Sequence, residues 1–484
     1  MKKIFFFAII PLFVLLSSCY KEGALGPMGL GFDNGISSGE QYNTFSENPF
    51  VKAIDEPVST FSIDADGGSY SNVRRFLKGG EMPPVDAIRV EELINYFQYN
   101  YADPIDQHPI GISTEVGECP WNADHKLIQI GIKGKSIAKE NYPASNFVFL
   151  VDVSGSMSSA NKLPLVKTGM KFLLDEMRDI DRMAIVTYAS SPGVALNSTN
   201  DKEKIRKAID KLGAGGSTAG AGGINRAYEI AEENFVVDGN NRIIIATDGD
   251  FNVGISDQDE LIKLIEKKRE SGVFLTTIGV GTGNLNEGML EQLANNGNGT
   301  FEYIDNELQA RKVFIDEFGK FFTVAKDVKI QIDFDPAVVE LYRLIGYENR
   351  VLNDSDFTND AKDAGEIGAG QTITAIYEIK STQVAFLRGS HPISINFRYK
   401  KPNSDVSELI VKAATDDLTP FASTSEDFRF ASAITSFGLL LRNSEYKGDT
   451  DYDKVLNWVN NARTFDPNSY RFYSTDLIKI AKGL

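Results

Sequence analysis

Two kinds of hydrophobic pattern divide the chain, and the first occupies its middle. There, short continuous apolar runs alternate with segments whose apolar residues recur at helical spacing. The runs are FVFLV from Phe147, MAIVTYA from Met183, RIIIAT from Arg242 and VFLTTIGVG from Val273. Continuous runs of this length are typical of strands that are covered on both faces. We therefore expect an α/β part with a doubly wound, mainly parallel sheet over residues 144–322.

The second pattern is strict alternation of apolar and polar residues, and it flanks the first. It is found in 128–132, in 328–334 and in 393–399. Period-two patterns indicate half-buried, antiparallel strands. Neither flank holds enough strands to bury its apolar face alone. We therefore expect one β-sandwich, interrupted in sequence by the α/β part, in which the strands near Ile128 share a sheet with those near Val328.

Apolar residues also recur at helical spacing in two segments outside the α/β part, one near residue 90 and one near residue 430. Val90, Leu93, Ile94 and Phe97 recur in this way after two prolines. The same spacing returns at Phe430, Ile434, Phe437 and Leu441. We expect a helical segment and the first sandwich strands over 45–143, the remaining sandwich strands over 323–423, and a helical C-terminal region over 424–484.

The first residues have the features of an export signal. Lys2 and Lys3 precede the apolar run IFFFAIIPLFVLL, which is typical of a secretory signal peptide over 1–18. The next residues, LSSC, resemble a bacterial lipobox, which implies cleavage before Cys19 and lipid attachment to its sulfur. Residues 19–44 are rich in Gly and Ser and predict a flexible tether. Tyr20, in place of an aspartate, favours the outer membrane. The alternative is an ordinary cleaved signal with an incidental cysteine.

Charge narrows the range of partners. The chain has a formal net charge of −17, and removing the two lysines of the signal makes it more negative. Such a chain repels phosphate backbones, so we do not expect nucleic acid as a partner.

Candidate ligands for a cation follow the central strands. Asp152, Ser154 and Ser156 come directly after the first apolar run, in VDVSGSM. Thr218 lies in the glycine-rich stretch GAGGSTAGAGG, and Asp248 follows the run IIIAT. The carboxyl ends of parallel strands meet at one edge of a sheet, so these side chains are expected to converge there. Hydroxyl and carboxylate oxygens suit Mg²⁺ or another hard divalent cation such as Mn²⁺.

These five residues resemble the metal-ion-dependent adhesion site of the von Willebrand factor type A domain. The family pattern is D-x-S-x-S, then a threonine, then the aspartate of T-D-G, and the sequence matches it in order. The resemblance implies that both serines and Thr218 bind the metal directly, while Asp152 and Asp248 act largely through water. The flanking segments, such as STFSIDADGGSYSNVRRFL and FRFASAITSFGLLLRNSEY, resemble those of one bacterial lipoprotein family.

These and neighbouring motifs have three other interpretations: a capped turn, a nucleotide site and a calcium loop. D-V-S-G-S before a helix is also compatible with a capped turn. The glycine-rich stretch lacks the lysine of a P-loop, which argues against a nucleotide site. The segment DADGG at Asp64 imitates a calcium loop, but Gly68 stands where a ligand is needed, and we interpret it as a turn.

The sequence therefore predicts a lipid-anchored protein of the cell envelope that is not an enzyme. It would use a Mg²⁺-dependent site to bind an Asp or Glu side chain of a protein partner, in adhesion or scaffolding. Two alternatives stay open: a metal-assisted hydrolase, and a structural envelope protein whose metal only braces its loops. None of the three histidines lies within 144–322, which disfavours the hydrolase.

Overall fold

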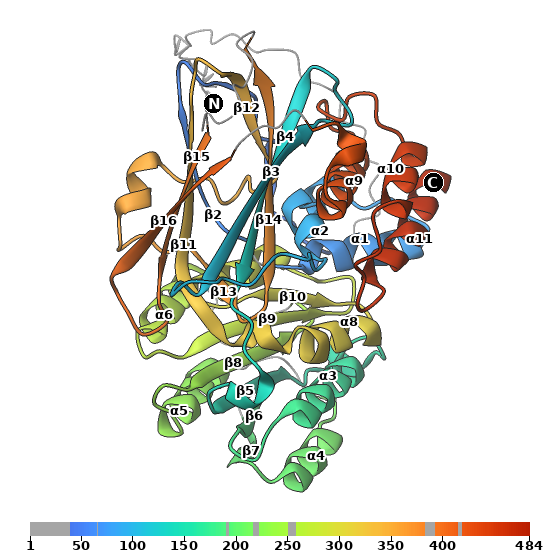
Figure 1. Ribbon diagram of the computed structural model, residues 1–484. Coiled ribbons are helices and arrows are strands. Elements are labelled where there is room, and N and C mark those ends of the chain that lie inside the picture. The colour runs from blue at the N-terminus through green and yellow to red at the C-terminus, as the bar shows by residue number, and fades with distance from the viewer. Residues whose placement is uncertain are drawn as a thin grey trace, which may run out of the picture. The chain divides into compact units, whose positions relative to one another are not determined.

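The six-stranded sheet whose strands end at or just before Asp152 and Asp248 lies at the centre of the α/β part (Figure 1). The computed structural model describes residues 39–64, 66–189, 193–215, 222–249, 258–382, 393–414 and 419–484. All of them belong to one unit, Gly39–Leu484. Every pairing in the sheet is parallel except that of the edge strand β7 with β6. In spatial order the strands are β10 (Phe301–Ile304), β9 (Phe274–Val280), β8 (Asn240–Thr247), β5 (Ser145–Asp152), β6 (Arg182–Tyr188) and β7 (Gly193–Thr199).

Helices cover both faces of this sheet, as the apolar runs predict. On β5, Phe147, Phe149 and Val151 pack in one apolar cluster with residues of α3 and α4. Val148 and Leu150 point the other way, into a cluster with residues of α5 and α6. The sheet is therefore doubly wound. The helices of this part are α3 (Leu163–Glu176), α4 (Lys202–Lys211), α5 (Gly223–Glu233), α6 (Gln258–Arg269), α7 (Glu287–Asn296) and α8 (Glu307–Arg311).

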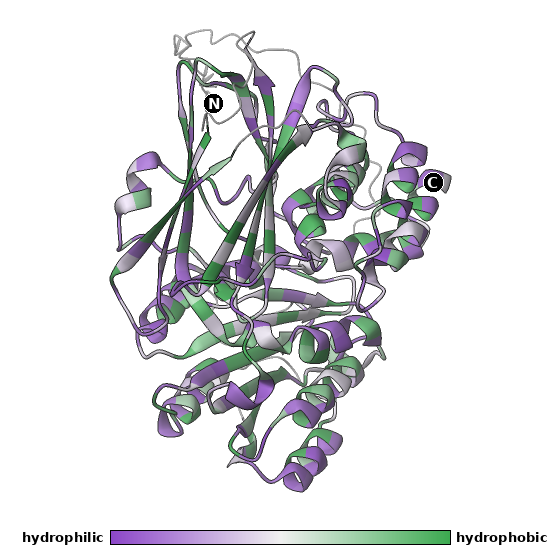
Figure 2. Ribbon diagram, in the orientation of Figure 1, coloured by the Kyte–Doolittle hydropathy of each residue, from purple (hydrophilic) through white to green (hydrophobic). Residues whose placement is uncertain are grey.

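Two further sheets form the β-sandwich, with antiparallel pairing throughout. The first has the order β1 (Val51–Lys52), β12 (Val339–Ile345), β14 (Thr372–Ser381), β4 (His125–Gly134) and β3 (Ile110–Glu118). The second has the order β13 (Gly365–Gly368), β11 (Thr323–Phe334), β15 (Ile393–Lys400) and β16 (Ser407–Ala414), and β2 (Val58–Ser62) also pairs with β11. Alternating green and purple bands along these strands in Figure 2 reflect their period-two pattern.

The expected pairing of the two alternating groups is wrong. Strand β4, which holds Ile128, lies in the first sheet, and β11, which holds Val328, lies in the second. Their apolar residues meet instead across the interior of the sandwich, in one buried cluster. Alternation reports that one face of a strand is buried, and strands of two facing sheets satisfy it equally well. The neighbours of β4 are β14 and β3, and the sequence patterns singled out neither of them.

Helices from both ends of the described chain form a third layer on the first sandwich sheet. Helix α2 lies against both α9 and β14. Five helices (α1, α2, α9, α10 and α11) form this layer, and residues of each share one apolar cluster with Leu127, Ile345 and Ile376 of the sheet. Both faces of β14 are therefore covered. The helices are α1 (Gly68–Lys78), α2 (Val90–Asn95), α9 (Glu426–Leu441), α10 (Tyr452–Asn460) and α11 (Tyr470–Gly483).

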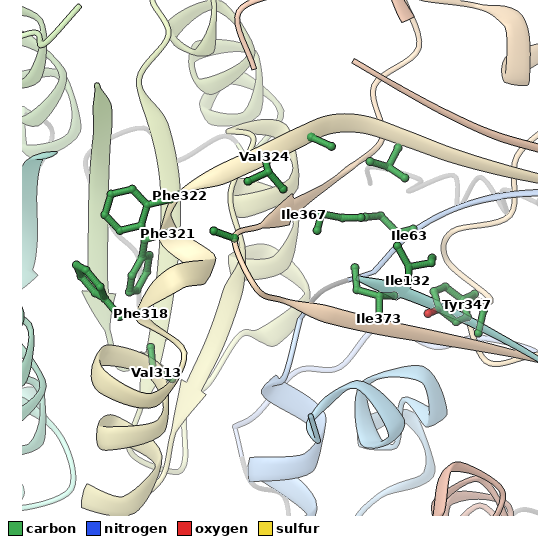
Figure 3. Close-up of a cluster of buried hydrophobic side chains, with 14 of the residues drawn as sticks. Ile63, Ile132, Val313, Phe318, Phe321, Phe322, Val324, Tyr347, Ile367 and Ile373 are labelled. Carbon is green, nitrogen blue, oxygen red and sulfur yellow. The ribbon is translucent and has the colours of Figure 1, made fainter. Parts of the chain in front are cut away.

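The α/β part and the sandwich share a hydrophobic core at their junction (Figure 3). A π-helical turn, Lys312–Asp316, and a 3-10 turn, Phe318–Phe321, lead from the α/β part directly into β11. Their apolar side chains continue without a break into those of the sandwich. Figure 3 labels Val313, Phe318, Phe321, Phe322, Val324, Ile367, Ile373, Ile132, Ile63 and Tyr347 of this cluster. The α/β part and the sandwich are thus joined by a packed hydrophobic interface as well as by the chain.

Candidate metal site

The two aspartates of the candidate site lie at the carboxyl ends of adjacent parallel strands, Asp152 as the last residue of β5 and Asp248 just after β8. Strands β5 and β8 pair in register through Val151 and Ala246, so Asp152 and Asp248 emerge at the same edge of the sheet. Both aspartates are fully buried. Ser154 is buried as well, and Ser156 is exposed. Thr218 lies outside the described residues, so its predicted place at this edge stays a prediction.

The turn after β5 is organised by the Asp152 carboxylate. Its Oδ1 accepts a hydrogen bond from the backbone N–H of Ser154 at 2.8 Å, and the hydroxyl of Thr247 lies 3.4 Å from its Oδ2. An Asp that binds its own backbone two residues on forms a tight Asx turn. The Oγ atoms of Ser154 and Ser156 lie 2.9 Å apart. The spacing D-x-S-x-S therefore presents two hydroxyls together beside a buried carboxylate.

The two oxygens of Asp248 have different surroundings. Oδ2 forms an ion pair with the ammonium of Lys162 at 2.7 Å. Oδ1 is buried and has no hydrogen-bond partner among the described residues. A buried carboxylate oxygen without a partner is costly, so such an atom indicates a missing ligand such as an ion or a water.

The conformation of Gly249, which follows Asp248, explains why the T-D-G motif ends in glycine. Its φ of +113° lies in a region that side chains rarely adopt. A Cβ at this position would come within 2.2 Å of the carbonyl oxygen of Asn284. The strand therefore turns sharply after Asp248, and only a residue without a side chain fits the turn.

The charges of the site are not balanced by the described side chains alone. Burial raises the pKa of Asp152 above its ordinary range, and the neighbouring Asp248 carboxylate adds to this effect. Lys162 is the one basic side chain paired with either aspartate among the described residues. Two carboxylates, one of which has an unpartnered Oδ1, and two hydroxyls fit a divalent cation, which would supply the missing positive charge.

A second acidic group was interpreted from the sequence only as a turn. Carboxylate oxygens of Asp64, Asp66 and Glu291 lie within 4.8 Å of one another, and all three residues are buried. The guanidinium of Arg350 lies 3.1 Å from Asp64, 3.3 Å from Asp66 and 3.5 Å from Glu291. The cation of this group is thus an arginine. It joins the N-terminal segment, the sandwich loop after β12 and helix α7 of the α/β part.

Comparisons with known proteins agree with this arrangement. A model described as von Willebrand factor matches residues 36–129, one of the von Willebrand factor type A domain matches 146–316, and one described as uncharacterized protein YfbK, C-terminal, matches 319–484. The Escherichia coli (strain K12) uncharacterized protein YfbK is 40% identical over 481 residues, which cover 92% of this chain and 81% of that protein.

Two more distant matches concern parts of the chain. Uncharacterized protein sll0103 of Synechocystis is 26% identical over 201 residues, which cover 41% of this chain and 47% of that protein. A solved structure described as von Willebrand factor type A from Catenulispora acidiphila is 17% identical, covers 66% of this chain and 77% of that chain, and has a TM-score of 0.39.

Proposed function

Because the chain belongs to the YfbK family and carries a von Willebrand factor type A domain, which is a protein-interaction or adhesion module, we propose that it binds a partner protein through a divalent cation. The cation is Mg²⁺ or a similar ion such as Mn²⁺. The partner supplies an Asp or Glu side chain as a further ligand. The residues that would hold the cation are Asp152, Ser154, Ser156, Thr218 and Asp248.

The observation that carries this proposal is the donor set at the strand ends. Neighbouring oxygens around an octahedral Mg²⁺ lie about 3 Å apart, since each is about 2.1 Å from the metal. The hydroxyls of Ser154 and Ser156 already have this spacing, at 2.9 Å. The unpartnered Oδ1 of Asp248 is available to hold a metal-bound water. Direct ligation by neutral hydroxyls leaves the ion electrophilic, which favours a carboxylate from outside.

The surroundings of the described histidines argue against a serine hydrolase. Hydrolysis by a serine needs a base, and the two described histidines pair with residues of the sandwich, His108 with Tyr399 and His125 with Glu378. His391 lies outside the described residues. A metal-assisted hydrolase remains the alternative, as does a protein in which the metal only braces the loops. Turnover of generic ester and phosphate substrates would favour the hydrolase.

Affinity capture tests the binding function. The tagged protein is loaded with envelope extract in Mg²⁺, and bound proteins are eluted with EDTA and identified. Asp248→Asn should abolish binding of the identified partner, and Mg²⁺ should restore wild-type binding after EDTA. Asp175→Asn, a change of an exposed aspartate on α3, is the matched control. A partner that binds Asp248→Asn as tightly as wild type, or ignores EDTA, would contradict the proposal and favour a purely bracing metal.

The proposal includes a lipid anchor at Cys19, a residue outside those described, and an outer-membrane location. It rests on the lipobox-like LSSC and on Tyr20. Two or more acyl chains hold a protein stably on a membrane. In the part of the chain that the structure describes, none of the helices has the length and apolar character of a membrane span. Cys19→Ser should release the protein from the membrane fraction, and retention of this variant without detergent would exclude the anchor.

A further inference from the structure

We propose that Lys162 is a built-in counter-ion of the metal site, which stabilises the site without metal and weakens its affinity for the divalent cation. This inference rests on the proposed function, because it concerns the regulation of that same site. Lys162 touches neither the serines nor Asp152 through any described hydrogen bond. It acts through Asp248 and is therefore a positioning residue.

The ammonium of Lys162 is held where it neutralises one oxygen of Asp248. Its Nζ lies 2.7 Å from Oδ2 of Asp248 and 3.4 Å from Oδ1 of Asn284. The Lys162 side chain is only 10% exposed, and the aspartate is fully buried. An ion pair shielded from water in this way is screened little by salt, so its charge acts strongly on any other ion nearby.

The fold makes room for the stem of this lysine. A Cβ at Gly281, just after β9, would lie 2.4 Å from Cε of Lys162 and 2.6 Å from its Cγ. Gly281 also has a φ of +79°, which disfavours any other residue there. The Lys162 stem thus lies directly on the backbone of a glycine, and a larger residue at 281 would displace it.

The backbone fixes the lysine from the other side. Lys162 precedes α3, where its N–H donates to the carbonyl oxygen of Ser159 at 3.0 Å and its carbonyl accepts from Val166 at 3.0 Å. Both ends of the side chain are therefore held, the Cα by the start of the helix and the Nζ by Asp248. Such a residue pays little further conformational entropy to remain in this place.

The position of Lys162 has two consequences for the metal. Without a cation, Asp152 and Asp248 are two buried carboxylates near each other, and the lysine offsets one of their charges. With a cation, the ammonium leaves only Oδ1 of Asp248 for a metal-bound water and repels the ion. The lysine therefore stabilises the metal-free site and makes the cation-bound site less favourable. Binding of the cation is thus readily reversible.

Titration of the full-length protein with Mg²⁺ tests this role by isothermal calorimetry. Lys162→Met keeps the apolar stem over Gly281 and removes the charge. We expect it to bind Mg²⁺ roughly tenfold more tightly than wild type, since a nearby repelling charge is removed. In EDTA we expect a lower melting temperature than wild type, with most of the loss recovered in Mg²⁺. Lys171→Met, which removes a half-exposed lysine of α3 that pairs with Asp210, is the matched control and should change neither value.

The outcomes separate the inference from the function on which it rests. Unchanged or weaker Mg²⁺ affinity in Lys162→Met would overturn the role of the lysine while leaving the metal site intact. Wild-type protein that takes up no Mg²⁺, or Asp248→Asn that takes up as much as wild type, would overturn the metal site itself. If Lys162→Met folds only in Mg²⁺, the inference is supported. If it fails to fold with or without metal, and Lys162→Gln behaves in the same way, the lysine is purely structural and the inference is wrong.

Discussion

The rings of Tyr142 and Phe322 stack on each other, with centroids 4.0 Å apart and planes 10° from parallel. Tyr142 lies shortly before β5, the first strand of the α/β part, and Phe322 directly follows the last turn of that part. The chain therefore leaves the sandwich and returns to it at one point. Phe322 is buried and belongs to the hydrophobic cluster of Figure 3, which continues into the sandwich.

This stack should couple the two parts energetically. We expect Phe322→Ala to lower the free energy of unfolding by about 3–5 kcal/mol, because it removes a large buried ring from the junction. A double-mutant cycle with Tyr142→Ala should give a coupling of about 0.5–1.5 kcal/mol, as for other aromatic pairs. Urea denaturation followed by circular dichroism measures both quantities. Strictly additive losses would show that the rings do not act together.

Arg350 should be among the most important single side chains for stability. Arg350→Met leaves Asp64, Asp66 and Glu291 buried without their cation, and we expect a loss of about 3–5 kcal/mol. Arg226→Met removes an arginine whose ion pairs on α5 are exposed, and it should cost less than about 1 kcal/mol. Thermal melts of the two variants make the comparison. Equal melting temperatures would mean that the acidic group is stable without its arginine.

The raised pKa values of buried carboxyls near Asp64, Asp66 and Glu291 predict that the free energy of unfolding falls as pH rises. Burial raises the pKa of Glu91 to about 7, with Glu348 adding to the shift, and burial raises the pKa of Glu287 to about 8. The folded state thus binds protons more tightly than the unfolded state. The stabilisation is complete below the unfolded pKa of 4.5 and is lost as pH rises toward about 7–8.

The contribution of Glu91 can be isolated by measuring the free energy of unfolding at pH 5 and pH 8 in EDTA. Glu91→Gln replaces a titrating acid by a neutral side chain of similar shape. We expect it to remove up to about 3 kcal/mol of the fall in stability between the two pH values. Glu81→Gln, at an exposed position of the same segment, is the control. A wild-type stability that rises over this range, with the same slope in Glu91→Gln, would contradict the expectation.

Ser154 should be needed for metal binding and dispensable for folding. Ser154→Ala removes one proposed ligand, and we expect Mg²⁺ affinity to fall about 10- to 100-fold or more. The melting temperature in EDTA should change little, because Ser154→Ala retains the backbone N–H of residue 154, which donates to Asp152. Ser158→Ala, at an exposed position of the same loop, should bind Mg²⁺ like wild type. Wild-type affinity in Ser154→Ala would remove this residue from the site.

The central strands, and the sheet edge at which the two aspartates of the site lie, could be predicted from the sequence. Continuous apolar runs mark β5, β6, β8 and β9 because strands covered on both faces need apolar residues throughout. Since parallel strands end at one edge, the positions of Asp152 and Asp248 at the carboxyl ends of β5 and β8 follow from chain order alone. The neighbours of β4 do not. Strand β14 is buried on both faces by the helices and the second sheet, so its mixed pattern gave no clear signal.

Lys162 and Arg350 show why the rest of the site chemistry was missed. A lysine before a helix and an arginine in a loop are ordinary surface residues in sequence. Their buried partners come from distant segments, Asp248 for Lys162, and Asp64, Asp66 and Glu291 for Arg350. The glycine that accommodates Lys162, Gly281, is separated from it by most of the α/β part. Such pairings depend on the tertiary fold, and no local spacing encodes them.

The topology of the sandwich also dictates an order of assembly during synthesis. All six strands of the α/β part are contiguous in the chain, so this part is complete soon after β10 has been made. Strand β2 must wait for β11, and the hairpin β3–β4 must wait for β14. Their open edges stay exposed meanwhile and are prone to aggregation. The α/β part is thus the first folded body, on which the two ends of the chain assemble afterwards.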